Sequence, residues 1–270
     1  MYHKRRRLTA IGAAVAAVLA VPGLAWAGGN LPSGGLVYAG VPQSFYYTTM
    51  YDYWSVIAVQ PNFGDNYSLY LLTVGGGYLD LSNYGADDTN FVAVDSNSGT
   101  EPYAMYYGQV NSVVPGSYWI QAQYGQNAIS IPTPTHQGTT GFSDPDITYS
   151  DLNDNNIVSI SDIYLSAGES FWAVSPDAAQ MMYLLEATPG QSSTYIQSRA
   201  QASSIQETKV IDNCTLYTAK QTGWHALVKV NDVPPTGNAN QGEAVGIHAY
   251  DPNYPNYCPL ADFPSATPGP

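Results

Sequence analysis

Hydrophobic and polar residues alternate along most of this chain in short runs that end at turn residues. The runs are rich in β-branched and aromatic side chains and are bounded by Gly, Pro, Asn or Asp; they are residues 55–59, 67–72, 90–94 and 118–122. Runs of this length and composition predict β-strands. Residues 177–185 fit either one or two helical turns or a buried strand. Strands at this spacing predict an all-β protein made of antiparallel β-sandwiches.

Segments of the first half resemble segments of the second half in the same order. Residues 53–56 match 171–174, residues 70–72 match 183–185, and residues 116–119 match 223–225. Two consecutive sandwiches of about 100 residues would explain this repeat, and chance similarity among Tyr-rich strands is the alternative. We predict a first jelly-roll- or immunoglobulin-like sandwich over 28–132 and a second over 142–232. Between them we predict a linker over 133–141, and after them a Pro-rich C-terminal segment over 233–270.

The N-terminus has the pattern of a secretory signal. Residues 4–7 are basic, residues 8–21 are apolar, and Ala25-Trp26-Ala27 places small residues at the two positions that a signal peptidase reads. The apolar run is shorter than a membrane span of about 20 residues. We therefore predict a signal peptide over 1–27, an extracellular location and no membrane insertion after signal removal. An uncleaved N-terminal anchor is the alternative.

Charge narrows the range of partners. The chain of 270 residues has a formal charge of −13, and residues after 27 keep four basic against 21 acidic side chains, a charge of −17. No Lys or Arg occurs between Gly28 and Arg199. Nucleic acids and anionic membranes bind proteins through Lys and Arg, so both are excluded as partners. Divalent cations, glycans and other extracellular proteins remain.

The chain has two cysteines, Cys214 and Cys258, which are 44 residues apart. In an exported protein such a pair predicts one disulfide. Closing a loop of this length stabilises a fold by about 3–4 kcal/mol in the chain-entropy model. The disulfide would also tie the C-terminal segment to the second half, whereas two free thiols are the alternative.

Three segments carry a resemblance to a known family. Residues 165–172 (LSAGESFW), 222–228 (TGWHALV) and 115–121 (PGSYWIQ) resemble the strand–turn–strand and closing-strand motifs of bacterial pre-peptidase C-terminal-like domains. The resemblance covers most of residues 45–125 and 155–232. It implies a jelly-roll- or immunoglobulin-like sandwich that is secreted, often appended to hydrolases and sometimes bound to calcium. No catalytic domain accompanies these modules here, which departs from the usual arrangement.

An oxygen-rich segment is the strongest candidate for a metal site. Counted from Asp151, oxygen side chains stand at positions 1, 3, 5, 9 and 12, the order of an EF-hand- or dockerin-type calcium loop. The predicted ligands are Asp151, Asn153, Asn155 and Asp162, and calcium is the one cofactor that we predict. A plain polar turn before the next strand is the alternative. A weaker acidic cluster combines Asp87 and Asp88 with Asp95.

No catalytic motif is present. The sequence has no G-x-S-x-G, H-E-x-x-H or P-loop pattern, and we predict that the protein is not an enzyme. A secreted hydrolase of the peptidase or glycosidase type, with an unrecognised site, is the alternative function.

Aromatic residues fall into two groups. Trp54, Trp172 and Trp224 lie in predicted strands and are expected in the cores. The tyrosines in turn-rich stretches can supply a binding surface, because Tyr offers a large contact area at low entropic cost; they are Tyr103, Tyr106, Tyr107, Tyr250, Tyr254 and Tyr257. In a Lys-poor chain, Tyr can instead serve as an amphipathic filler.

These features together predict a secreted, non-catalytic binding or structural protein of the cell envelope or extracellular space. Its expected partner is an extracellular protein or glycan. A calcium-dependent lectin is a further alternative, because it would use both the acidic loop and the exposed tyrosines.

Overall fold

The computed structural model describes residues 33–48, 54–62, 65–86, 88–95, 105–124, 147–153, 157–174, 180–185, 195–199, 207–211, 214–232 and 242–256. These residues form seventeen strands in four antiparallel sheets, which pack in pairs. The prediction of an all-β protein is therefore confirmed. The predicted signal peptide lies outside the described residues. Within the described ranges, no helix has the length and apolar character of a membrane span.

The first pair of sheets is built mainly from the first half of the chain. Its strands are β1 (Ser33–Val37), β2 (Gln43–Thr48), β3 (Trp54–Pro61), β4 (Ser68–Thr73), β5 (Tyr78–Ser82), β6 (Asn90–Asp95), β7 (Met105–Asn111), β8 (Gly116–Tyr124) and β13 (Tyr195–Ser198). The inner sheet has the order β1-β8-β3-β6-β13 and the outer sheet has the order β2-β7-β4-β5. Between them lies a buried core that includes Ile57, Leu69, Val92 and Val110. The four strand runs predicted within 55–122 thus all form strands.

The second pair of sheets comes from the second half. Its strands are β9 (Ile147–Asn153), β10 (Val158–Leu165), β11 (Ser170–Val174), β12 (Gln180–Leu184), β14 (Glu207–Ile211), β15 (Cys214–Thr218), β16 (Gly223–Asn231) and β17 (Gly242–Ala249). The inner sheet has the order β10-β16-β12, and the outer sheet has the order β14-β15-β11-β17-β9. Their core includes Ile163, Phe171, Leu227 and Ile247. Strand β12 settles the open choice at 177–185 in favour of a strand.

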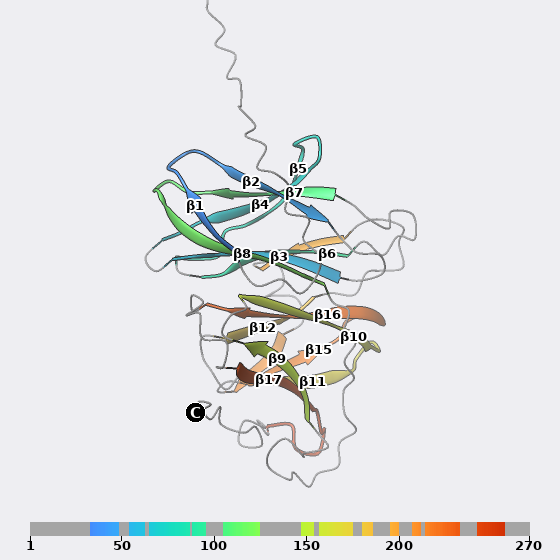
Figure 1. Cartoon of the computed structure of the whole chain (residues 1–270). Coiled ribbons are helices and arrows are strands. Elements are labelled where there is room, and N and C mark those ends of the chain that lie inside the picture. The colour runs from blue at the N-terminus through green and yellow to red at the C-terminus, as the bar shows by residue number, and fades with distance from the viewer. Residues whose placement is uncertain are drawn as a thin grey trace, which may run out of the picture.

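A third core joins the two inner sheets, so the sheets stack in four layers (Figure 1). We call this contact the junction. Alternate residues of β3 and β6, such as Val56 and Phe91, pack there against β10, β16 and β12. Every residue of β3 and of β6 is buried, because one face of each strand fills the first core and the other fills the junction. Burial on both faces explains why these strands are apolar without a polar alternation.

Two strands cross the predicted domain boundaries. β13 lies within the range of the predicted second sandwich, yet it pairs with β6 in the inner sheet of the first pair. β17 lies in the predicted C-terminal segment, yet it pairs with both β9 and β11. The division into domains at 132, 141 and 232 stays a prediction, but the hydrogen bonding of the sheets does not follow those limits.

The two halves repeat a strand–turn–strand unit that the sequence comparison did not align. β1 pairs with β8 and β10 pairs with β16. At the turn after each, a glycine with positive φ, Gly40 at 67° and Gly168 at 86°, donates its N–H to the carbonyl of Ser112 or Ala219 respectively, at 2.9 and 2.7 Å. Only glycine adopts such a φ without steric cost. The two turns are therefore equivalent.

This equivalence corrects the predicted repeat. Because β2 follows the first turn and β11 follows the second, β11 corresponds to β2, and β12 corresponds to β3. The match of 53–56 with 171–174 joins β3 to β11, and the match of 70–72 with 183–185 joins β4 to β12, so both are wrong. The match of 116–119 with 223–225 joins β8 to β16, which do correspond. Aromatic and aliphatic composition is shared by many strands, whereas a turn glycine marks one position.

Cys214 begins β15, fully buried and opposite Val174 and Ile211. It is not a free thiol. Its predicted partner, Cys258, lies outside the described residues, so the disulfide between them stays a prediction.

The junction predicts that the two pairs of sheets unfold together. Phe91 is fully buried, and its ring centroid lies 5.6 Å from that of Tyr183 on β12. We expect Phe91→Ala to lower the free energy of unfolding by about 3–5 kcal/mol in a single urea transition followed by circular dichroism. Val113→Ala, at a side chain that is 87% exposed, is the control and should change little. Two separate transitions in the wild type would contradict this expectation.

Candidate functional site

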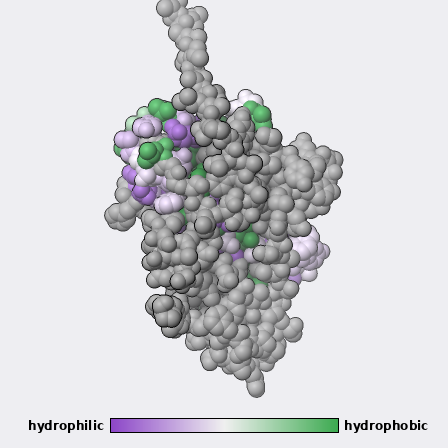
Figure 2. All heavy atoms as spheres, in the orientation of Figure 1, coloured by the Kyte–Doolittle hydropathy of each residue, from purple (hydrophilic) through white to green (hydrophobic). Residues whose placement is uncertain are grey.

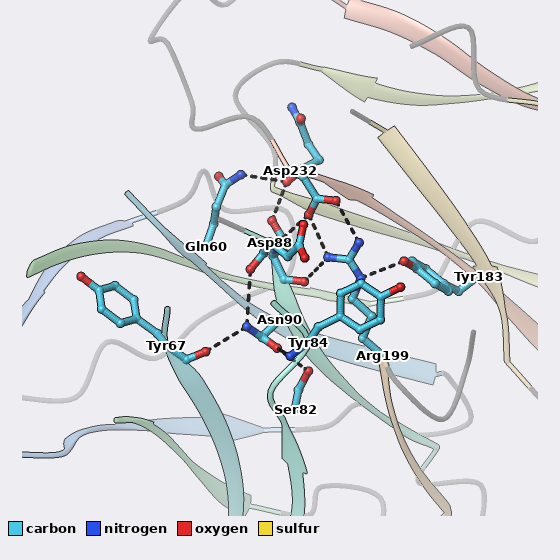
Figure 3. A network of polar contacts seen from close by, with 11 residues as sticks. Gln60, Tyr67, Ser82, Tyr84, Asp88, Asn90, Tyr183, Arg199 and Asp232 are labelled. Carbon is cyan, nitrogen blue, oxygen red and sulfur yellow. Dashed lines mark hydrogen bonds and ion pairs between the residues drawn. The ribbon is translucent and has the colours of Figure 1, made fainter. Parts of the chain in front are cut away.

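A buried arginine links the halves at one end of the junction. Arg199 follows β13 and is 1% exposed. Its Nη1 and Nη2 each donate to a carboxylate oxygen of Asp232 at 2.8 Å, and Nε donates to the Tyr183 hydroxyl at 2.8 Å. Nη1 also donates to the Thr89 carbonyl. Figure 3 shows these contacts converging from three separate segments of the chain.

The network continues into both pairs of sheets. Thr89 donates its N–H to Asp232 at 2.7 Å, and Gln60 on β3 donates to the Asn231 carbonyl at 2.9 Å. On the first-half side, Asn90 accepts from Ser82 and from the Tyr84 N–H. The end of β16 is thus held to β3 and β6 by hydrogen bonds as well as by apolar packing.

Electrostatics favours the charged form of Arg199. Burial alone would lower the pKa of its guanidinium, but the hydrogen bonds and charge of Asp232 outweigh burial and hold that pKa above its ordinary value. Burial raises the pKa of the Tyr183 hydroxyl, although the nearby Arg199 charge opposes this. The guanidinium also lies over the Tyr84 ring, 4.2 Å from its centroid. An arginine has five N–H donors, and most of these already have partners inside the protein, so this network is suited to holding the fold rather than a ligand.

An exposed aromatic pair stands at the other end of β10 and β16. Tyr164 and Trp224 are opposite one another in the register, 54% and 48% exposed, with ring centroids 5.5 Å apart at 76°. The turn beside them is fixed by two hydrogen bonds, from the Ser166 N–H to Glu169 at 2.7 Å and from the Ala167 N–H to Thr222 at 2.9 Å. A rigid β-ladder therefore presents two large rings to solvent.

Trp54 and Trp172 are buried as predicted, whereas Trp224 is not. Trp54 and Trp172 are each 1% exposed. Trp224 lies on the same face of β16 as Ala226 and Val228, which belong to the junction core. The opposing inner sheet ends before it reaches Trp224, so the Trp224 ring stays accessible to solvent. Strand alternation gives the face of a residue, but the length of the opposing sheet decides whether it is buried.

The predicted calcium ligands are divided between two sheets. Asp151 and Asn153 lie on β9, opposite Ala244 and Gly242, with side chains outside the described ones, and Asn155 lies outside the described residues. Asp162 lies on β10, where its neighbours Ile163 and Leu165 face the second core. Asp162 therefore faces the other way, into the junction. Among the described residues no group of three or more His, Cys, Asp or Glu is placed to hold a metal, and the calcium site stays a prediction.

The predicted acidic cluster around residue 88 is not formed as expected. Asp88 precedes β6 and Asp95 ends it, so the strand separates them, while Asp87 lies outside the described residues. Asp95 instead lies near Asp162 across the junction, close enough for their charges to interact. This proximity has no local sequence signal, because the two carboxylates are 67 positions apart and lie on different sheets.

The predicted binding tyrosines are described only in part. Tyr106 and Tyr107 lie on β7, opposite Tyr47 and Tyr46 of β2, and their side chains are not among those described. Tyr254 is 61% exposed in the turn after β17, and Tyr250 is half-buried nearby. Tyr103 and Tyr257 lie outside the described residues. The tyrosine surface stays a prediction, because only Tyr250 and Tyr254 have described side chains.

Exposed apolar side chains also gather at the turns of the first pair of sheets. The β1–β2 and β7–β8 turns touch through the hydrogen bond from Gly40 to Ser112. The exposed large side chains next to these turns in the chain are Leu36, Tyr38, Val41, Val113 and Val114. Figure 2 shows hydrophobic groups among hydrophilic ones at the upper left of the molecule.

Comparison with known proteins identifies no family, because no protein-family model and no curated protein matches the chain.

The Arg199 network predicts a large cost for removing its counter-charge. Asp232→Ala leaves a guanidinium buried without its carboxylate, and breaking such a pair costs about 3–5 kcal/mol. We expect this loss in the free energy of unfolding measured with urea. Asp251→Asn is the control, because asparagine keeps the acceptor for the Asn253 N–H. A loss below about 1 kcal/mol, the value typical of exposed pairs, would show that the network does not hold the junction.

Proposed function

We propose that this protein is a secreted, non-catalytic binding protein of the cell envelope or extracellular space. In this proposal it consists of two sandwiches of the pre-peptidase C-terminal-like kind after a signal peptide over 1–27. The repeated Ala-Gly turns at Gly40 and Gly168, with the same hydrogen bond in each half, support the tandem arrangement. The sequence of residues 1–27 supports export.

The observation that carries the binding role is the exposed Tyr164–Trp224 pair. Large aromatic side chains are among the strongest contributors to binding surfaces, and half-exposed rings held by a β-ladder lose little entropy when a ligand covers them. The face of a sugar ring that carries C–H groups is apolar and matches the face of an aromatic ring. A charge of −17 after residue 27 disfavours acidic glycans, so we propose a neutral glycan as the ligand.

The groups around the aromatic pair on the β10–β16 ladder are better suited to binding a ligand than to catalysing a reaction. The groups beside the pair are the Thr222 hydroxyl and the Glu169 carboxylate, and both accept hydrogen bonds from the turn backbone. These groups fix the shape of the surface around the rings. The partner proposed here is thus recognised by stacking and shape, with hydrogen bonds at the rim.

Trp224→Ala should weaken binding to neutral polysaccharides on the order of tenfold or more, the size typical of an aromatic hot spot. The measurement is a glycan array followed by titration of the best ligand, with the exposed Tyr78→Ala on β5 as the matched control. Unchanged binding in Trp224→Ala together with loss in Tyr254→Ala would move the site to the C-terminal tyrosines.

The same assay separates the alternative functions. A calcium-dependent lectin would lose binding in a chelator, whereas the Tyr164–Trp224 surface needs no metal and should keep it. A hydrolase would release soluble products from a polysaccharide or a peptide substrate over time. Absence of binding to every neutral glycan, with binding to an extracellular protein instead, would contradict the glycan proposal and leave the binding role in place.

A further inference from the structure

Two neighbouring turns at one end of the first pair of sheets expose an apolar surface. The β1–β2 turn and the β7–β8 turn each cross between the two sheets of that pair. They touch through the 2.9 Å hydrogen bond from the Gly40 N–H to the Ser112 carbonyl. Residues 36, 38–42 and 113–115 are all exposed, and the Tyr38 hydroxyl is the one polar side-chain group among them. We call these nine residues the apolar tip.

The backbone holds the apolar tip in a fixed shape. The Val41 N–H donates to the Tyr38 carbonyl at 2.9 Å, and the Val114 N–H donates to the Ser112 hydroxyl at 3.2 Å. The side chains project from these turns into solvent, and Val113 is 87% exposed. Residues that are already ordered lose little conformational entropy when a partner covers them.

The equivalent turn of the second half shows that this geometry does not require apolar residues. There the Gly168 N–H donates to the Ala219 carbonyl, and the Glu169 N–H donates to the Ser166 carbonyl at 2.9 Å. Counted from these bonds, the corresponding residues are Tyr38 and Ser166, Val41 and Glu169, Val113 and Lys220, Val114 and Gln221, and Pro115 and Thr222. One turn is therefore polar where the other is apolar. Consecutive exposed apolar residues that the fold does not need indicate an interaction surface.

The apolar tip comes from two segments without charge. No Asp, Glu, Lys or Arg occurs in residues 28–51 or 102–143, although the chain after residue 27 carries a charge of −17. A carboxylate beside the tip is that of Asp65, which accepts a hydrogen bond from Tyr67 at 2.8 Å and lies next to Gly116. An anionic partner would be repelled by the rest of the molecule, so the tip suits an uncharged one.

The size and shape of the tip distinguish between uncharged partners. A stable protein interface takes about 20–30 residues from each side, whereas the tip offers nine, on turns that project outward. A second copy of the chain would bring two such projecting surfaces together and bury little area. A lipid surface needs no matching shape, because apolar side chains enter between its headgroups and affinity follows the apolar area buried. Tyrosine is favoured at this boundary, since its ring is apolar and its hydroxyl is polar.

We propose that the apolar tip docks this protein on a lipid surface that has no net charge, with the turn side chains lying among the headgroups. The charge of −17 after residue 27 restricts docking to such lipids, so the exclusion of anionic membranes stays in place. No segment spans the membrane in this contact. The docking goes beyond the proposed glycan binding and does not depend on it.

Flotation with phosphatidylcholine vesicles tests the proposal. The double variant Val41→Glu, Val113→Lys keeps the net charge and places on the tip the two side chains that the equivalent turn carries at Glu169 and Lys220. We expect the wild type to float with the vesicles and the partition coefficient of the variant to fall on the order of a hundredfold, because burying one valine changes binding by about tenfold. Circular dichroism and urea unfolding should match the wild type.

Val74→Lys is the matched control. Val74 is 53% exposed in the β4–β5 turn, which lies at the other end of the outer sheet because Thr73 pairs with Tyr106 near the start of β7. This variant should float like the wild type. Trp224→Ala should also keep its vesicle binding, which separates lipid docking from the proposed glycan site.

The lipid composition gives a second readout. Replacing half of the phosphatidylcholine by anionic phosphatidylglycerol should weaken binding, because the protein is acidic. The proposal is overturned if the wild type does not float with phosphatidylcholine vesicles, if the double variant floats equally well, or if phosphatidylglycerol strengthens binding. A dimer that forms without lipid and is lost in the double variant, together with no flotation, would overturn it in favour of a second copy of the chain.

Discussion

Burial of one face of β3 and β6 against β10, β16 and β12 is the contact on which the rest of this structure depends. Each inner sheet would otherwise present a broad apolar face to water, because its other face already fills the core of its own pair of sheets. Apolar area removed from water stabilises a fold by roughly 25 cal/mol per Å². The junction is therefore a core in its own right and makes the two halves one body.

Apolar packing alone does not set the register of one inner sheet on the other, and polar groups define the two ends of the junction. At one end, Arg199 brings the segment after β13 into contact with Thr89, Tyr183 and Asp232. At the other end, Asp95 and Asp162 lie near one another. A bidentate ion pair tolerates only a narrow range of geometries, so the Arg199–Asp232 pair restricts how the two inner sheets can sit at its end of the junction.

The same arrangement of strands explains why an exposed aromatic surface lies just beyond the junction. β10 and β16 extend past the sheet that covers them, and the first row outside the junction is Tyr164 with Trp224. The row just inside contains Asp162. In the proposed function, the rings that contact a ligand thus lie on β10 and β16, one row beyond Asp162.

Local residue patterns were enough to predict several of the strands. Strand runs such as 55–59 and 90–94 were predicted because β-branched and aromatic residues between turn residues favour strands whatever they pack against. The burial of Trp54 and Trp172 was predicted for the same reason. The repeat between the two halves was predicted, but two of its three matches joined the wrong strands because many strands share an aromatic composition. The informative signal was a single glycine in each turn, Gly40 and Gly168.

Which side chains meet depends on how the sheets pack, and local sequence patterns do not show this. Arg199 and Thr89 are 110 residues apart in the chain, and Phe91 and Tyr183 lie on different sheets, so no local pattern links the members of either pair. The exposure of Trp224 depends on where the opposing sheet ends, and the pairing of β13 with β6 depends on a long return of the chain. Strand propensity and alternation act over neighbouring residues. Layer order and sheet length instead arise because the whole molecule buries its apolar faces at once. The positions of the Arg199 network and of the Tyr164–Trp224 pair follow from layer order and sheet length.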